Sequence, residues 1–256
     1  MVNFLVRQAA VARSLLTSSA GLWRGTLVLK AAKQPPRPLV LYEFEATPAC
    51  RAVREVLTAL HLDAQIRPCP EGGKRYRPKV RQLSGSDQLP VLIDQNADRV
   101  MTNAADIVAY LFRQYGEMEV PMGYSPRLTM PLGDALSSSL RLGRGWQVRA
   151  SRKPKKTLDL WSFESSPYSR LVRERLSELQ LPYTLHNLGK EHWDELGPAA
   201  RRLRPGHYLP TEGGKRHAFW LKHQRVQVPY LEDPNQDVTL FESAKIVDYL
   251  EEQYAI

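Results

Sequence analysis

The chain contains an internal repeat, and this repeat limits the possible folds more than any other feature of the sequence. Residues 39–62 match residues 158–181 at 12 of 24 positions when the sequence is shifted by 119. Residues 103–115 match residues 242–254 at seven of 13 positions with a shift of 139, so the second copy is longer by about 20 residues. Two copies of one supersecondary unit predict two similar domains in tandem.

Both copies show the same order of predicted elements. A short apolar run, "PLVLYEF" in the first copy and "LDLWSF" in the second, predicts a buried strand. Thr47 or Ser166 followed by proline is typical of an N-cap and the first position of a helix, and apolar residues at three-to-four spacing predict the helix itself. A second strand, a third strand opened by Pro90 or Pro229, and a final helix complete the order βαβαββα.

The repeat also predicts the domain organisation. We expect a basic N-terminal segment over residues 1–37, a first domain over 38–116, a linker with a basic segment over 117–156, and a second domain over 157–256. The roughly 20 additional residues of the second copy are expected within about 184–226. The linker contains "EVPMGYSPRLTMPLGD", which is rich in Pro and Gly, as is common at domain boundaries.

Composition favours a soluble protein of a reducing compartment, which we take to be the cytoplasm. Cys50 and Cys69 are the only cysteines, too few for a secreted disulfide framework, and no apolar run is long enough to cross a membrane. The first 42 residues lack Asp and Glu, which also fits an organellar transit peptide. A similar basic stretch recurs at 137–156, and this favours a structural segment before each repeat.

The formal net charge of +9 favours anionic partners. The basic residues are spread along the chain and form no stripe interleaved with aromatic residues, so nucleic acid is not the expected partner. Binding of nucleic acid through the basic linker remains a third hypothesis, which a steep dependence of affinity on salt would reveal.

The order of elements, with proline opening the third strand, resembles the thioredoxin fold of glutaredoxins and of the N-terminal domain of glutathione S-transferases. The resemblance covers residues 38–116 and 157–254 and is closest to tandem proteins of this transferase domain found in bacteria and plant plastids. It implies an α/β fold of two thioredoxin-like domains and glutathione, or another thiol, as ligand or co-substrate. No all-helical transferase domain is expected after the second repeat, so ordinary conjugation of glutathione is not expected either.

The resemblance directs attention to the two cysteines. Glutaredoxins place a nucleophilic cysteine at the N-terminus of the first helix, where Thr47 and Ser166 stand here, which excludes the usual dithiol reaction. Cys50 occupies the resolving position in the first helical turn, where the helix dipole favours a lowered pKa. Cys69 follows the parallel second strand and is expected at the same sheet edge. The two are candidates for thiol-transferase chemistry; two buried, inert cysteines are the alternative.

The second copy retains the pattern of a glutathione site more completely. By the resemblance, the Ser166 hydroxyl would bond the glutathione sulfur, Val228 before a cis Pro229 would pair with the cysteinyl backbone, and Glu242 and Ser243 would receive the γ-glutamyl carboxylate. The corresponding positions of the first copy hold Thr47, Leu89, Pro90, Asn103 and Ala104. Alternatively, the serines are only N-caps and the proline only a turn of the fold.

Residues 189–227, which cover most of the insertion in the second copy, contain four histidines and two tryptophans. Their spacing matches no compact metal-binding signature and no cysteine accompanies them, so no metal site is expected. A loop that covers the active edge or binds a protein partner is the preferred interpretation. A non-catalytic adaptor built from two degenerate domains is therefore the alternative function. The histidines are His192, His207, His217 and His223.

Overall fold

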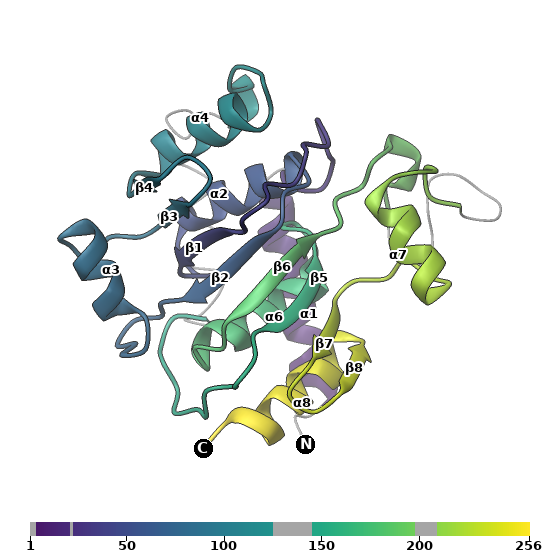
Figure 1. Cartoon of the computed structure of the whole chain (residues 1–256). Helices are drawn as coiled ribbons and strands as arrows, with labels where there is room; N and C mark the ends of the chain where they lie inside the picture. Colours follow the sequence, from purple (N-terminus) through teal and green to yellow (C-terminus); the bar gives the residue numbers. More distant parts are fainter. Residues whose placement is uncertain (1–3, 21–22, 125–144, 198–208) are drawn as a thin grey trace.

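The computed structural model describes residues 4–20, 23–124, 145–197 and 209–256 (Figure 1). Helix α1 (Phe4–Ala20) comes first. The first repeat contains β1 (Leu39–Glu43), α2 (Pro48–Ala59), β2 (Ala64–Pro68), α3 (Arg77–Ser84), β3 (Val91–Asp94), β4 (Arg99–Met101) and α4 (Ala104–Gln114). The second contains β5 (Leu158–Ser162), α6 (Pro167–Glu178), β6 (Tyr183–Asn187), α7 (Lys215–His223), β7 (Tyr230–Asp233), β8 (Val238–Phe241) and α8 (Ser243–Tyr254). Two short 3-10 turns are η1 (Met122–Tyr124) and η2 (Trp193–Glu195).

The order βαβαββα occurs in both repeats, so the predicted α/β fold of two tandem thioredoxin-like units is confirmed. The first helix of each repeat begins where it was predicted to begin. Thr47 Oγ1 accepts a hydrogen bond from the Cys50 N–H, and Ser166 Oγ accepts one from the Ser169 N–H, each with proline at the next position. Strands β6 and β7 are separated by 20 more residues than β2 and β3, and the extra length precedes α7.

The two repeats join edge to edge in one eight-stranded sheet, in the order β4-β3-β1-β2-β6-β5-β7-β8 (Figure 1). Within each repeat the first two strands are parallel and the other pairs are antiparallel. The junction is the antiparallel pairing of β2 with β6, which places Ile66 opposite Tyr183 and Ala64 opposite Leu185. The strand order is therefore symmetric about this junction, as expected for two copies of one unit facing each other across a pseudo-two-fold axis.

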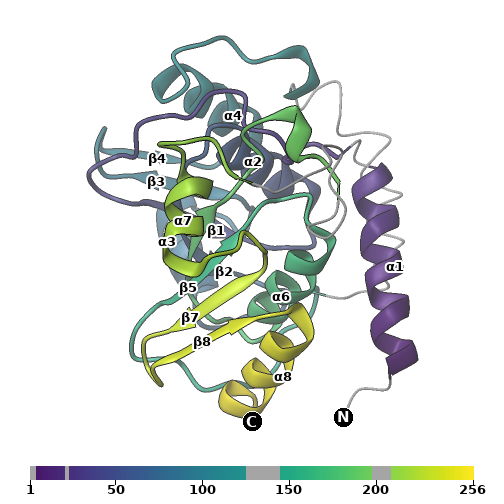
Figure 2. The ribbon, with the colours of Figure 1, turned by 90° about the vertical axis from the view of Figure 1, so that its right-hand side faces the viewer.

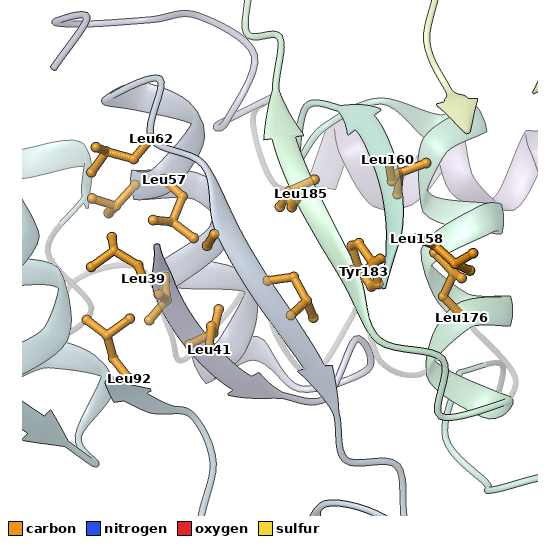
Figure 3. Packing of buried hydrophobic residues seen from close by; sticks show 14 of the residues in the cluster. Leu39, Leu41, Leu57, Leu62, Leu92, Leu158, Leu160, Leu176, Tyr183 and Leu185 are labelled. Carbon is orange, nitrogen blue, oxygen red and sulfur yellow. The ribbon is translucent and has the colours of Figure 1, made fainter. Parts of the chain in front are cut away.

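Alternation along the strands divides the core between the two faces of the sheet. Leu39 and Leu41 of β1 face a cluster that includes α2, α4, α6 and α8, and Leu158 and Leu160 of β5 face the same cluster (Figure 3). On the opposite face, α3 and α7 cover two separate, smaller clusters. A fully buried leucine contributes about 1.5–3 kcal/mol. The continuous cluster therefore stabilises the two repeats as one body.

The segment before each repeat pairs with the other repeat. Leu27 forms a parallel bridge with Lys190 beyond β6, while Gln147 forms the corresponding bridge with Glu71 beyond β2. The supporting backbone bonds measure 2.8–3.0 Å. Helix α1, which precedes the first repeat, also contacts the second repeat and packs along α6 (Figure 2). These contacts support a structural role for the two basic segments, although residues 137–144 lie outside the described part of the chain.

None of the described helices is long and apolar enough to span a membrane.

Candidate functional site

The loops that follow β1 and β5 meet where the two repeats join, and each carries a buried glutamate. Arg54 of α2 donates from Nε to Glu164 of the second repeat at 2.9 Å, and its guanidinium also contacts Glu43 and Glu45 of its own repeat. Arg173 of α6 crosses in the opposite sense, with 3.1 Å from its Nε to Glu45 Oε2. These five residues, all essentially inaccessible to solvent, are called the inter-repeat charge cluster.

Burial and mutual charge decide the protonation of this cluster. Burial raises the pKa of Glu43 to about 7, and Glu45 and Glu164 add to the rise while Arg54 opposes it. Burial also disfavours ionised Glu164, but the Arg173 and Arg54 guanidiniums hold its pKa well below the usual range. With Glu43 protonated, the two arginines contact the carboxyl groups of Glu45 and Glu164, and Glu164 stays ionised between them. The buried charges of the cluster therefore compensate each other without solvent.

Sequence analysis missed this cluster, although the repeat contained a signal for it. Glu45 matches Glu164 and Arg54 matches Arg173 in the alignment of the two copies. Charged residues on a solvated surface can be exchanged for other polar residues at little cost. Identical charged residues at equivalent positions of two domains therefore indicate a buried role. Only the strand pairing shows that each arginine reaches a glutamate of the other repeat.

The expectation of a lowered pKa at Cys50 is wrong. The side chain is completely buried, and burial, followed by the nearby Glu43, raises the pKa of the thiol to about 12. Its Sγ accepts a hydrogen bond from the Phe44 N–H at 3.4 Å. Burial also raises the pKa of Cys69, whose N–H donates to the Glu43 carbonyl at 2.7 Å. Both thiols are free and protonated, so this environment does not support attack by a thiolate.

The structure brings four of the predicted glutathione-site residues of the second repeat together. The Val228–Pro229 peptide bond is cis, as predicted, and the pairing of Tyr230 with Phe241 places it beside the start of α8. Gln227 Nε2 donates to Glu242 Oε1 at 2.5 Å and so connects the proline loop to the helix. Val228, Pro229, Glu242 and Ser243 therefore surround one helix N-terminus.

The corresponding helix of the first repeat has a side-chain cap. Asn103 caps α4, and its Oδ1 accepts from the N–H groups of Ala105 at 2.8 Å and Asp106 at 3.2 Å. The Leu89–Pro90 bond is also cis, so the backbone of the two repeats agrees at this point. The cap residue of α8 is Glu242, and its side chain makes no such bond. Of these two helices, α4 has a side-chain cap and α8 has none. The first N–H groups of α8 are therefore not bound by a capping side chain.

Ser166 lies under α1. Only 3% of its surface is exposed. Ser14 Oγ of α1 donates to the Pro167 carbonyl and Ser18 Oγ donates to the Ser165 carbonyl, each at 2.8 Å. Helix α1 is therefore hydrogen-bonded on both sides of the residue that the sequence assigned to the glutathione sulfur.

The described histidines of the insertion are His192, His217 and His223. Among the described residues, no group of three His, Cys, Asp or Glu side chains could hold a metal ion. His192 pairs with Asp194 at 3.0 Å, and His223 packs against Phe219 and Tyr230. His207 lies outside the described residues.

A histidine that sequence analysis did not select connects the repeats instead. His186 of β6 bonds Asp159 of its own repeat at 2.9 Å and Asp63 of the first repeat at 3.2 Å, and it stacks on Trp161. Burial disfavours its cation, but the hydrogen bonds to Asp159 and Asp63 raise its pKa to about 9. Asp63 Oδ1 also accepts a hydrogen bond from Lys215 Nζ of α7 at 2.6 Å.

The stability of the protein is expected to depend on the ionisation of His186. Folding favours the protonated ring, so this stabilisation is complete below the ordinary pKa of 6.5 and is lost as pH rises through about 9. Urea unfolding over that range should show wild type losing up to roughly 3 kcal/mol more than His186→Gln. Glu43 titrates in both proteins and cancels in the difference. Parallel pH profiles of the two proteins would contradict this assignment.

Two thioredoxin-like domains in tandem define the class of this protein. A family model described as "Glutathione S-transferase, N-terminal domain" matches residues 41–119 and again residues 160–255. The chain therefore belongs to the glutathione S-transferase N-terminal domain family. No curated protein and no solved structure matches the chain significantly. The narrower likeness to bacterial and plastid tandem proteins stays a prediction.

Proposed function

We propose that the second repeat binds glutathione, or a related γ-glutamyl thiol, and that neither Cys50 nor Cys69 reacts with it. The observation that carries this proposal is the start of α8, where no side chain caps the helix and the cis proline loop lies alongside. Membership of the transferase family supports glutathione as the ligand class. The buried, protonated cysteines argue against a thiol-transferase role.

The γ-glutamyl group of glutathione carries one carboxylate and one ammonium, and the start of α8 suits both. Backbone N–H groups and the positive end of the helix dipole favour the carboxylate, together with the hydroxyl of Ser243. The exposed carboxylate of Glu242, held by Gln227, provides an acceptor for the ammonium. The half-buried Val228 offers its backbone to the cysteinyl unit.

The sulfur of glutathione is the part for which this site offers least. Ser166 would need α1 to move away before its hydroxyl met a ligand, and the hydroxyl already caps α6. Binding therefore rests on Val228, Glu242 and Ser243, and activation of the sulfur by Ser166 would be a further step coupled to displacement of α1. Thr47 and Pro90 are the equivalents of Ser166 and Pro229 in the first repeat. There the final helix, α4, is capped by Asn103.

Titration calorimetry with reduced glutathione tests the proposal. Wild type should bind saturably, and the variant Glu242→Ala, Ser243→Ala should bind at least roughly tenfold more weakly, because a charge-assisted hydrogen bond contributes about 1.5–3 kcal/mol. The matched control is Asn103→Ser in the first repeat, which keeps a capping side chain on α4 and should bind as wild type does. Equal affinity in the double variant, or no binding to wild type, would refute a glutathione site here.

A non-catalytic protein-binding module is the second candidate, favoured by the apolar surface of the insertion. Trp193 and Leu209 are each 64% exposed and Leu221 is 57% exposed. Large exposed apolar side chains of this kind mark interaction surfaces when they gather. Under this alternative, Trp193→Ser with Leu221→Ser would abolish binding of a protein partner, whereas the Glu242 and Ser243 changes would not. Under the glutathione proposal, the Glu242 and Ser243 changes weaken glutathione binding, whereas the Trp193 and Leu221 changes do not.

A further inference from the structure

A basic cavity lies at the end of the second repeat where the linker meets the β7–β8 turn and the end of α8. Its volume is about 330 Å³, within the range of small-molecule sites. Its lining contains four cationic side chains from one short segment and no carboxylate. The four are Arg152, Lys153, Lys155 and Lys156. We refer to this cavity as the basic cradle.

The backbone of the basic cradle is held at both ends. Asn235 of the β7–β8 turn accepts from the Lys156 N–H at 2.7 Å and donates from Nδ2 to the Lys156 carbonyl at 2.9 Å. At the other end, the Arg152 N–H donates to the Tyr254 carbonyl at 2.8 Å. The cationic side chains therefore stand on a positioned segment and not on a free loop.

The charge of the basic cradle is not neutralised within the described structure. Arg152, Lys153, Lys155 and Lys156 are exposed, and in the described ranges none of them lies within salt-bridge distance of a carboxylate. Arg149, three residues earlier, is by contrast paired with Glu251 at 2.5 Å. Four unpaired cations around one cavity create a positive potential that an anion would lower.

The first repeat provides an internal comparison. Asn96 Oδ1 accepts from the Arg37 N–H at 3.0 Å, and Asn96 Nδ2 donates to the Arg37 carbonyl at 2.8 Å. Asn235 makes the same two hydrogen bonds with Lys156. Residues 33–37 read "KQPPR" where residues 152–156 read "RKPKK", so Gln34 and Pro36 replace two lysines. Gln34 is used structurally and donates to the His61 carbonyl. The same backbone arrangement thus exists without the extra charge, and the fold does not require it.

We infer that the basic cradle binds a small anion that carries several phosphate groups, with a triphosphate chain as the matching chemistry. Lysine and arginine donors suit phosphate oxygens, and four of them suit a multiply charged ligand better than a single carboxylate. A single nucleic-acid strand fits less well, because such sites use exposed aromatic rings for base stacking. The aromatic residue in this lining, Tyr254, is buried, and its hydroxyl bonds Asp233.

Calorimetric titration with inorganic tripolyphosphate and with ATP tests this inference. Both should bind wild type with similar affinity, and binding should weaken as salt increases. The variant Lys153→Gln, Lys155→Pro gives the cradle the first repeat's residues at these positions and should bind at least roughly tenfold more weakly. This corresponds to about 1.4 kcal/mol or more.

Two further variants separate the explanations. Pro36→Lys in the first repeat adds a lysine outside the cradle and should not change affinity, and Glu242→Ala with Ser243→Ala should also leave tripolyphosphate binding intact. Unchanged affinity in the Lys153, Lys155 variant would overturn the inference. So would displacement of tripolyphosphate by an oligothymidylate that binds more tightly, since this would identify the cradle as a nucleic-acid surface.

Discussion

Replacement of Arg54 by methionine is expected to lower the free energy of unfolding by about 3–5 kcal/mol. Methionine replaces the aliphatic part of the arginine but has no charge, so Glu43, Glu45 and Glu164 lose a guanidinium that contacts all three. Arg173 is then left to compensate Glu45 and Glu164. Removal of one partner from a buried network costs more than the interaction itself contributes, because the other charges stay desolvated.

Urea unfolding followed by circular dichroism measures this effect. Arg113→Met is the control, since Arg113 and Glu119 form an exposed pair with side chains 65% and 81% accessible, and its loss should cost less than about 1 kcal/mol. Combining Arg54→Met with Glu164→Gln should recover part of the loss, because Arg173 then has one fewer buried carboxylate to compensate. A cost for Arg54→Met as small as that of the control would contradict the description of the cluster as buried and coupled.

Replacement of Gly25 by alanine should destabilise the protein by about 2–4 kcal/mol. Gly25 has φ of 71°, a conformation in which an L side chain is strained. An added Cβ would also lie 2.7 Å from Glu164 Cβ and 3.3 Å from the Glu55 Cα. The segment before the first repeat would thus be pushed away from the loop that carries Glu164.

Gly85 provides the matched control for Gly25. Its φ of 70° is nearly identical, but an added Cβ would meet no atom within 4 Å. Gly85→Ala should therefore cost only the backbone strain, about 1 kcal/mol, and the difference between the variants isolates the contact with Glu164. Equal effects of the two substitutions on the unfolding free energy would show that Gly25 matters for its conformation alone.

The inter-repeat charge cluster has a consequence for chemistry as well as for stability. The loops after β1 and β5 precede the helix starts where thioredoxin-like proteins place their reactive group, and here their glutamates point into the junction of the repeats. Cys50 follows one of these loops and shares its buried surroundings. Burial, followed by the nearby Glu43, keeps the thiol protonated, although Arg54 of the cluster acts in the opposite direction. The start of α8, where glutathione is proposed to bind, lies outside the cluster.

Local patterns in the sequence determined the elements of the fold. The proline after Thr47 or Ser166, the spacing of the leucines and the proline before β3 or β7 act within a few residues, so each could be recognised in a single chain. The tandem βαβαββα order, the two helix caps and the cis bond at Pro229 were predicted in this way. Family membership followed from the same residues.

Only the tertiary structure decided what surrounds the candidate site residues. Pairing of β2 with β6 brought Arg54 to Glu164 and Arg173 to Glu45, over sequence separations of 110 and 128 residues. The pKa of Cys50 also depends on tertiary packing, since the helix dipole alone favours a thiolate while burial beside Glu43 prevents it. Desolvation and charge pairing act between atoms that lie a few ångströms apart in space. The spacing of residues along the sequence does not predict which distant residues come that close.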